Sequence, residues 1–289
     1  MQAQERIKIC KQTRIKAAQA MADVLKMDKP ISEVDFCNQL NEKLSSNPEI
    51  WDQGWYSPPP KGLSALFAPE VDPKRVAYDN LRKEEFWPRK ENIFTDNSIG
   101  YIYASPINKL SGIIGDFGMT IYKGSNAKII EHIKSCLDLT EKTAEYAQVG
   151  MEFREIYDYC QKLMKEKGLN NERMITYTDK VGTNIGHTVP WSYKDPNLEE
   201  KQTLEGNSFE KVRELISTQR VHLNSKERFK IPPTIAFTIE PRAENSFLPG
   251  LPMSSFHTIL TFSEGKKEIL GNFNPIFQAV KMDFIKSKF

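Results

Sequence analysis

Thr234–Pro241 reads T-I-A-F-T-I-E-P, a run of beta-prone residues that places one carboxylate, Glu240, directly before a proline. Branched and aromatic residues in such a run predict a strand, and the proline ends it. Glu240 is therefore expected at a strand end, a usual position for a ligand or a catalytic base. The alternative is a strand-end acid that only meets solvent or an arginine.

The composition of the 289-residue chain excludes several classes of protein. Apolar residues make up 39% of it, enough for one large domain over residues 1–289 or two halves that share a core. Forty Lys and Arg against 38 Asp and Glu leave a formal charge of +2, too balanced to suggest nucleic acid or a membrane surface as partner. No apolar run approaches a membrane span, the N-terminus does not resemble a secretory signal, and the four cysteines lack C-x-x-C spacing. These features predict a soluble cytoplasmic protein.

Two helices followed by strands are predicted twice along the chain. The first set comprises helices at Gln2–Leu25 and Val34–Leu44 and strands at Leu63–Ala68, Ser98–Ala104 and Gly112–Tyr122. The second comprises helices at Ala127–Ala147 and Phe153–Lys167 and strands at Met174–Thr178, Ile235–Ile239 and Ser255–Phe262. Ser32, with Asp35 three residues on, resembles a capping box before the second helix.

A direct comparison within the chain supports a duplication. Asp35–Leu40 (D-F-C-N-Q-L) lines up with Asp158–Leu163 (D-Y-C-Q-K-L) at an offset of 123 residues. We therefore predict an α+β fold with pseudo-symmetric halves, about 1–124 and about 125–289, in which helices back one curved antiparallel sheet. The functional cleft is expected where the strands of the two halves meet.

Asp116 is the second acid in a beta-patterned run. It lies in Gly115–Thr120, G-D-F-G-M-T, between two glycines. A carboxylate inside an apolar strand is unfavourable unless it is paired, hydrogen-bonded or bound to a metal. The alternative is a turn acid in a glycine-rich hairpin.

Four segments resemble the methionine aminopeptidase, prolidase and creatinase superfamily. Phe237–Pro241 (F-T-I-E-P) resembles its glutamate strand, and Gly115–Thr120 its second-aspartate segment. Gly182–Gly186 (G-T-N-I-G) resembles its glycine-rich histidine loop, and His257–Gly265 its final hairpin. The segments occur in the order of the family, over about residues 5 to 270. The resemblance implies the pita-bread fold, in the compact form of the methionine aminopeptidases.

The resemblance also implies five metal ligands around two divalent ions that activate a bridging water. Only Asp116 and Glu240 match them. Ser105, Thr183 and Phe256 stand at the positions of the other three. Two carboxylates do not balance two dications, and a phenylalanine supplies no lone pair. We therefore expect no dinuclear centre and no other cofactor.

A single divalent ion is the alternative. The two remaining carboxylates would hold it with His187 or His257 as helper, because carboxylate and imidazole form a workable but incomplete set. If the alignment near the last ligand position is shifted by a few residues, Glu244 or Glu264 becomes the replacement ligand.

Three functions follow from these residues. The first is a pseudopeptidase whose cleft binds a peptide, a small molecule or a protein partner. The second is a metal-independent hydrolase or lyase on a small C–N substrate, as the resemblance to creatinase implies. His187, or else His257, would be its base, and Glu240 and Asp116 would orient the substrate. The third is a mononuclear metalloenzyme.

The three remaining ligand positions, Ser105, Thr183 and Phe256, are expected to contact whatever occupies the cleft. Trp191, at the start of the segment before Glu240, is the fourth substrate-binding candidate. Trp51–Pro60, rich in aromatics and prolines, is expected to line the cleft mouth, because Trp and Tyr make good recognition surfaces. A rigid surface loop is the alternative.

Residues 191–233 form an insertion that is long for a connection in a compact domain. Within it, Ser208–Leu223 has the pattern of an amphipathic helix. This helix is expected to be a lid over the cleft, a contact in a homodimer, or a helix packed against its own domain. His222, another histidine near the site segments, lies at its end.

Overall fold

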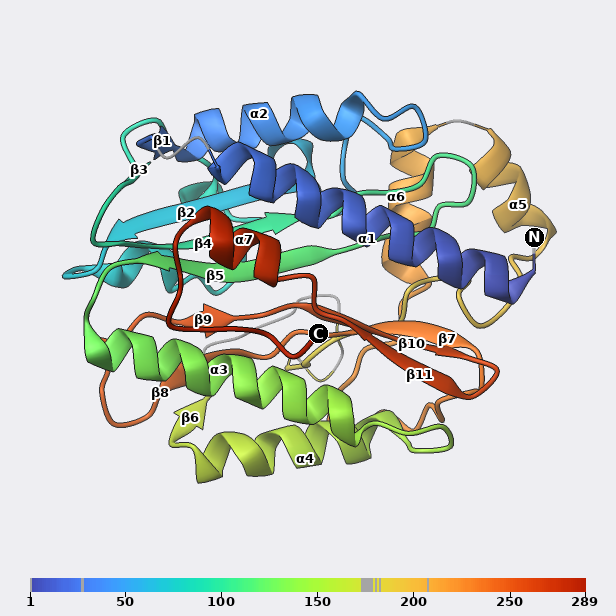
Figure 1. The fold of residues 1–289 in the computed structure, drawn as a ribbon. Coiled ribbons are helices and arrows are strands. Elements are labelled where there is room, and N and C mark those ends of the chain that lie inside the picture. The colour runs from blue at the N-terminus through green and yellow to red at the C-terminus, as the bar shows by residue number, and fades with distance from the viewer. Residues whose placement is uncertain (1, 27–28, 173–178, 180, 182, 207) are drawn as a thin grey trace.

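The computed structural model describes residues 2–26, 29–172, 179, 181, 183–206 and 208–289. The first half of the chain contains α1 (Ala3–Leu25), β1 (Ile31–Ser32), α2 (Glu33–Ser45), β2 (Leu63–Pro69), β3 (Ile93–Phe94), β4 (Ser98–Ala104) and β5 (Phe117–Lys123). The second half contains α3 (Ala127–Tyr146), α4 (Phe153–Glu166), β6 (Leu169–Asn170), α5 (Leu198–Glu205), α6 (Phe209–Thr218), β7 (Ile235–Ile239), β8 (Arg242–Asn245), β9 (Ser254–Ser255), β10 (Thr258–Ser263), β11 (Lys266–Leu270) and α7 (Asn274–Ala279). In Figure 1, α1 and α2 lie along the strands of the first half, and α3 and α4 lie along the strands of the second half.

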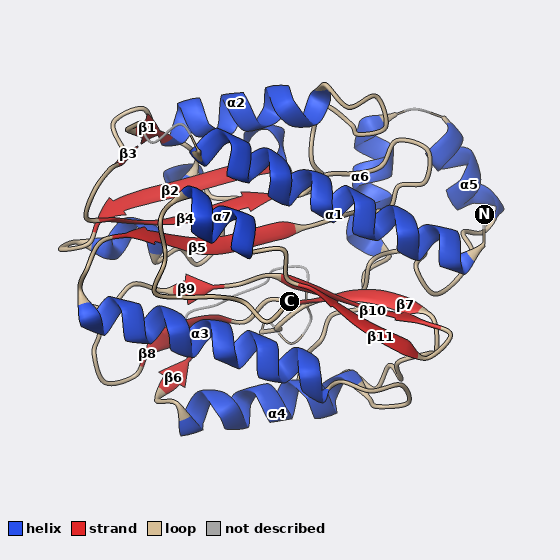
Figure 2. Ribbon diagram, viewed as in Figure 1, coloured by secondary structure: helices blue, strands red, loops and turns tan. Residues whose placement is uncertain are grey.

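The sheet consists of two antiparallel three-stranded parts. One has the order β2-β4-β5 and the other the order β11-β10-β7. They meet where Met119 of β5 forms a bridge with Phe256, and where the backbone N–H of His257 donates to Gly118 O at 2.8 Å. The short strands β6, β8 and β9 form a third sheet beside this junction (Figure 2). The predicted α+β arrangement of two helix-helix-strands halves is confirmed.

The main hydrophobic core passes through both halves. Phe117 of β5 packs against Phe273 with the two rings tilted and their centroids 5.7 Å apart, and Phe273 packs edge-on against Phe256 at 5.4 Å. All three side chains are buried. Aromatic pairs of this geometry add to the gain from burial, so the core ties the two halves together.

Local sequence signals account for most of the regular elements. Ser32 caps α2, and its side chain accepts from the backbone N–H of Asp35 at 3.1 Å. The predicted strands Leu63–Ala68, Ser98–Ala104 and Ile235–Ile239 are confirmed as β2, β4 and β7.

Three strand predictions had other outcomes. The strand expected at Gly112–Tyr122 begins only at Phe117, because Gly112 adopts a positive φ of 67° and the preceding residues close a turn. The run Ser255–Phe262 is divided into β9 and β10 by Phe256 and His257, which pair with β5 instead. The strand expected at Met174–Thr178 lies outside the described residues.

The insertion at 191–233 carries α5 and α6, and α6 packs against its own chain. Its buried face comprises Phe209, Val212 and Ile216. The Phe209 ring lies 5.8 Å from that of Trp51, and Arg213 donates to Ser57 O at 2.9 Å. The apolar face of this helix is therefore covered within the chain.

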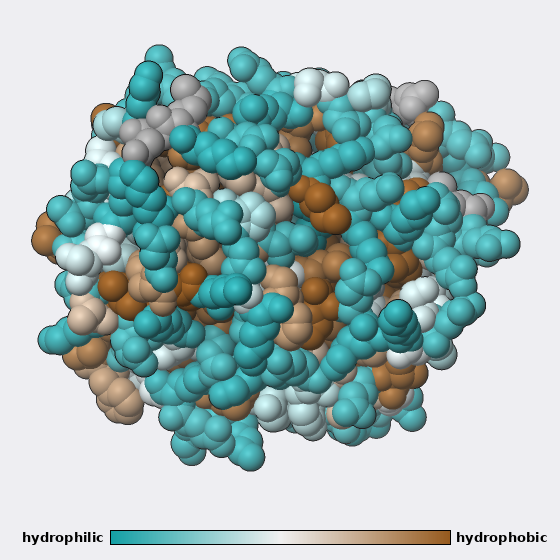
Figure 3. Space-filling model, viewed as in Figure 1, coloured by the Kyte–Doolittle hydropathy of each residue, from teal (hydrophilic) through white to brown (hydrophobic). Residues whose placement is uncertain are grey.

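Across the face shown in Figure 3, hydrophilic residues dominate and apolar residues gather in small groups. Among the described residues, no helix combines the length and apolar character needed to cross a membrane.

Candidate functional site

A cavity of about 80 Å³ lies where the two halves meet. Its wall is formed by aromatic rings and by charged or polar groups from seven segments of the chain. The lining residues are Trp55, Tyr56, Tyr78, Leu81, Tyr101, Tyr103, Asn184, His187, Arg220, His222, Glu240, Arg242 and His257. The expected position of Trp51–Pro60 at the cleft is thus confirmed for Trp55 and Tyr56.

Glu240, His257 and Tyr101 form a line of polar contacts in the cavity wall. Glu240 follows β7, and its Oε2 lies 2.9 Å from His257 Nδ1. His257 Nε2 lies 2.9 Å from the hydroxyl of Tyr101. Burial raises the pKa of Glu240, but His257, His187 and Arg242 outweigh it and hold that pKa well below its usual value. Burial also raises the pKa of Tyr101 well above its ordinary value, so a carboxylate and a phenol flank the imidazole.

Gly118 of β5 allows this line to form. A Cβ at Gly118 would lie 2.6 Å from the Tyr101 hydroxyl and 3.2 Å from His257 Cδ2. Both distances are shorter than ordinary van der Waals contacts, so any larger residue would displace the two side chains. The glycine in G-D-F-G-M-T therefore makes room for the site.

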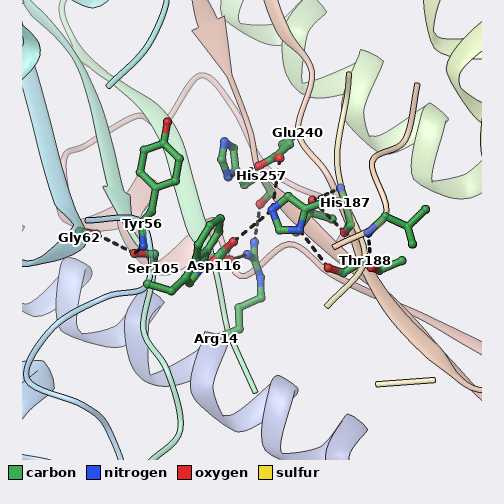
Figure 4. Close-up of polar contacts among 12 residues, drawn as sticks. Arg14, Tyr56, Gly62, Ser105, Asp116, His187, Thr188, Glu240 and His257 are labelled. Carbon is green, nitrogen blue, oxygen red and sulfur yellow. Dashed lines mark hydrogen bonds and ion pairs between the residues drawn. The ribbon is translucent and has the colours of Figure 1, made fainter. Parts of the chain in front are cut away.

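His187 lies between the two acids (Figure 4). Its Nε2 is 3.5 Å from Asp116 Oδ2 and 3.8 Å from Glu240 Oε1. Its Nδ1 lies 3.1 Å from Thr188 O, a carbonyl that can only accept, so Nδ1 carries the proton. Burial, together with the charge of Arg220, lowers the pKa of His187 to about 3. The imidazole is therefore neutral at pH 7, with its Nε2 lone pair facing the acids.

Asp116 lies behind the cavity wall, directly before β5. Trp55 Nε1 donates to its Oδ1 at 2.6 Å, whereas its Oδ2 has no hydrogen-bond partner among the described residues. Burial raises the pKa of Asp116 to about 8 against the opposing effect of the Trp55 bond, and Glu240 adds to the rise. The carboxyl group is therefore largely protonated at neutral pH.

Two arginines contribute permanent positive charge to the cavity. The Arg220 guanidinium lies 4.3 Å from the Trp55 ring centre, and that of Arg242 lies 5.0 Å from the Tyr78 ring centre. Burial lowers the pKa of Arg220, while Asp116, Tyr103 and Glu240 oppose that change. Guanidinium groups stay protonated under such shifts, so both residues are cations at pH 7.

Arg14 of α1 supports the site from behind. Its side chain is fully buried and donates to three backbone carbonyls, those of Asp116, His257 (2.5 Å) and Gly271 (2.8 Å). The guanidinium also lies 4.7 Å from the Phe117 ring centre. One side chain from the first helix thus fixes the backbone of both site segments.

The four candidate catalytic residues are brought together, since Asp116, Glu240, His187 and His257 form one contact network. The substrate-binding candidates are not. Ser105 is fully buried, donates to Gly62 O at 2.9 Å and accepts from Tyr56 N at 3.1 Å (Figure 4).

Phe256 and Trp191 are also buried away from the cavity. Phe256 packs against core rings, and Trp191 donates from Nε1 to Glu200 at 3.3 Å. Thr183 does not line the cavity, whereas its neighbour Asn184 does. None of the four substrate-binding candidates therefore lines the cavity, in contrast to their expected place at the cleft surface.

The proposed replacement ligands are equally remote. Glu264 is exposed in the turn after β10 and accepts from Gln4 at 2.5 Å, and Glu244 lies within β8. Neither lines the cavity.

The donor set does not fit a dinuclear metal centre. Over the described ranges, no group of three or more His, Cys, Asp or Glu is arranged to hold a metal ion. Asp116 is tied to Trp55, and His257 lies between Glu240 and Tyr101. The Arg220 cation faces the same acids, which opposes a second positive charge there.

Sequence reasoning missed the arginines and tyrosines of the site. Tyr101 and Tyr103 alternate along β4, a period-2 signal that places both on one face. Arg220 and His222 are likewise two residues apart and both reach the cavity. No local pattern marks Arg14, because its carbonyl partners come from distant segments.

Comparison with known proteins identifies relatives of this fold. The model of Metallopeptidase family M24 matches residues 82–261. The methionine aminopeptidase from Rickettsia prowazekii superposes with a TM-score of 0.62 and 13% identity, over 93% of this chain and 97% of that one. A search of curated protein sequences finds no match.

Longer relatives superpose as well. The X-Pro aminopeptidase from Thermotoga maritima MSB8 gives a TM-score of 0.60 with 12% identity, over 93% of this chain and 61% of that one. The Xaa-Pro dipeptidase from Bacillus anthracis gives 0.58 with 15% identity, over 92% and 60%. The chain spans about three fifths of these two proteins, and at such identities the likeness shows the fold alone.

Proposed function

Because the chain belongs to metallopeptidase family M24, we propose that it keeps the cleft of that family without the dinuclear metal chemistry and uses it to bind a small molecule. The observation that carries this proposal is Arg220. Its guanidinium lies in the cavity on Trp55 and supplies positive charge beside the two acids left at ligand positions, Asp116 and Glu240.

The size of the cavity favours a small ligand over a long peptide. A volume of about 80 Å³ holds on the order of five or six water positions. Typical sites for drug-sized ligands are several times larger, at ~300–1,000 Å³. A ligand of a few heavy atoms, or the end group of a peptide, fits this space.

Metal loading tests the proposal directly. After incubation with excess Zn²⁺, Mn²⁺ or Co²⁺ and gel filtration, we expect elemental analysis to find no stoichiometric metal, and we expect no release of N-terminal residues from peptides. Glu240→Gln is the matched control, because specific binding at the cleft would fall in that variant. Two ions per chain with peptide turnover would overturn the proposal, and one ion per chain lost in the control would support the mononuclear alternative.

A second candidate function is a metal-independent hydrolase or lyase acting on a small C–N substrate. The line Glu240–His257–Tyr101 favours it, because a carboxylate that orients an imidazole is the usual support for a general base. His187 is the other candidate base, with its Nε2 lone pair toward the acids.

Tyr101→Phe separates the two candidates. Loss of one hydrogen bond to His257 should lower the unfolding free energy by about 1 kcal/mol in either case. Under the binding proposal, wild type and variant both fail to release amine or ammonia from a panel of small amides, ureas and guanidines. If the second candidate is correct, the wild type turns one of them over and the variant is slower by ~10²–10⁴-fold. Tyr157→Phe, on α4 outside the cavity, is the control.

A further inference from the structure

We propose that the cavity is selective for a small oxyanion, specifically a carboxylate, with Arg220 as its principal contact. This inference rests on the proposed function, since it requires a cleft without metal ions. It goes further in naming the chemistry of the ligand.

Arg220 is a cation in the cavity wall that lacks an acceptor. Among the described residues its guanidinium makes no hydrogen bond or ion pair, and its buried Nε has no partner. The other cavity arginine, Arg242, donates to Asp79 O at 3.3 Å. A guanidinium offers five N–H donors, and a charge removed from water is normally paired. We assign the acceptor for these N–H groups to a ligand that enters the cavity.

The guanidinium is also held in place before any ligand arrives. Its central carbon lies over the Trp55 ring, and the indole is fixed by the bond from Nε1 to Asp116. A guanidinium held over an aromatic ring by cation–π attraction keeps its N–H groups for hydrogen bonds to other partners. The edge of an arginine matches two oxygens of one carboxylate.

A second unsatisfied nitrogen lies near the first along the chain. The buried Nδ1 of His222 has no partner among the described residues. His222 and Arg220 both line the cavity, two positions apart in the segment that follows α6. An unpartnered guanidinium nitrogen and an unpartnered imidazole nitrogen thus lie on one segment of the cavity wall, and the imidazole tautomer with its proton on Nδ1 can donate to an acceptor in the ligand.

The charge balance of the cavity agrees with an anion. Arg220 and Arg242 contribute two permanent cations, while the carboxylate of Glu240 lies 2.9 Å from His257. Asp116 lies behind the wall and is not one of the lining residues. One added negative charge therefore improves the balance, whereas an added cation worsens it.

The shape favours carboxylate over phosphate. The rings of Trp55, Tyr78, Tyr101 and Tyr103 and the side chain of Leu81 supply flat apolar patches between the charged and polar groups of the wall. A planar carboxylate with a short apolar body suits such a wall. The oxygens of a phosphate point in all directions, so a phosphate would need hydrogen-bond donors on every side of the cavity.

Calorimetry and thermal shift at fixed ionic strength test the inference, with acetate, butyrate, malonate, inorganic phosphate and ethylammonium as probes. We expect carboxylates to bind and to raise Tm by mass action. Arg220→Gln should weaken carboxylate binding about ten- to hundred-fold, and Arg220→Lys less. Arg228→Gln, an exposed arginine of the same connection, should bind as the wild type does.

Each other outcome has a distinct meaning. Stronger binding of phosphate than of any carboxylate would overturn the carboxylate assignment. Two results would overturn the inference: binding of ethylammonium alone, or no saturable binding of any anion at up to about a hundredfold molar excess over the protein. Neither result would contradict the proposed function, a cleft without metal ions. Equal affinity in wild type and in a folded Arg220→Gln variant, with circular dichroism as the check on folding, would also overturn it. Stoichiometric metal in the loading experiment would instead remove the proposed function itself.

Discussion

Replacing Arg14 with Met is expected to lower the free energy of unfolding by about 3–5 kcal/mol. The side chain is fully buried and satisfies the carbonyls of Asp116, His257 and Gly271. Methionine fills much of the same volume but donates nothing, so three buried carbonyls lose their partner. Urea denaturation measures the change as a lower midpoint with an unchanged slope.

The control for Arg14→Met is Lys16→Met on the same helix. Lys16 makes an ion pair with Glu49 at 2.6 Å, but both side chains are substantially exposed. Exposed pairs contribute at most about 1 kcal/mol, so this variant should remain near the wild type. Equal and small losses in the two variants would show that Arg14 does not hold the site segments together.

Glu33→Gln is expected to cost about 3 kcal/mol. Glu33 is completely buried at the start of α2. Its Oε1 accepts from Phe67 N (2.7 Å), Arg75 Nε (3.0 Å) and Asn92 Nδ2 (3.1 Å), and its Oε2 from Arg75 Nη2 (2.8 Å) and Arg89 N (2.8 Å). A glutamine amide would set N–H groups against these donors and leave the Arg75 charge without a partner.

The measurement is again urea denaturation, with Glu42→Gln as the matched control. Glu42 is exposed on the same helix, so its replacement should change stability by no more than about 0.5 kcal/mol. A double-mutant cycle with Arg75→Met then tests the cause. A coupling near zero would mean that the loss in Glu33→Gln does not arise from the contact with Arg75.

Local sequence was sufficient for elements whose signals are contained within a few residues. The beta-prone run Ile235–Ile239 forms β7, and the Ser32 cap starts α2. It was insufficient where a beta-prone run changes partner. Phe256 and His257 interrupt the last predicted strand because they pair with β5, a segment far away in the chain.

The candidate site shows the same division. Glu240, Asp116, His187 and His257 were identified from the sequence because acids at strand ends and histidines in loops carry a recognisable chemistry. Phe256, Ser105 and Trp191, which the sequence suggested at the cleft, are buried and do not line the cavity, since the direction of a side chain depends on which core it packs into.

By itself, the sequence determined the two-half α+β fold and the four acids and histidines that meet at its centre. The tertiary structure alone decided that arginines share this centre, with Arg220 on Trp55 in the cavity and Arg14 behind it. An arginine on a helix or loop has the same local pattern whether it meets solvent or a buried site. Its role depends on neighbours that only folding brings near, and the electrostatic interactions that define this cavity act between such distant residues.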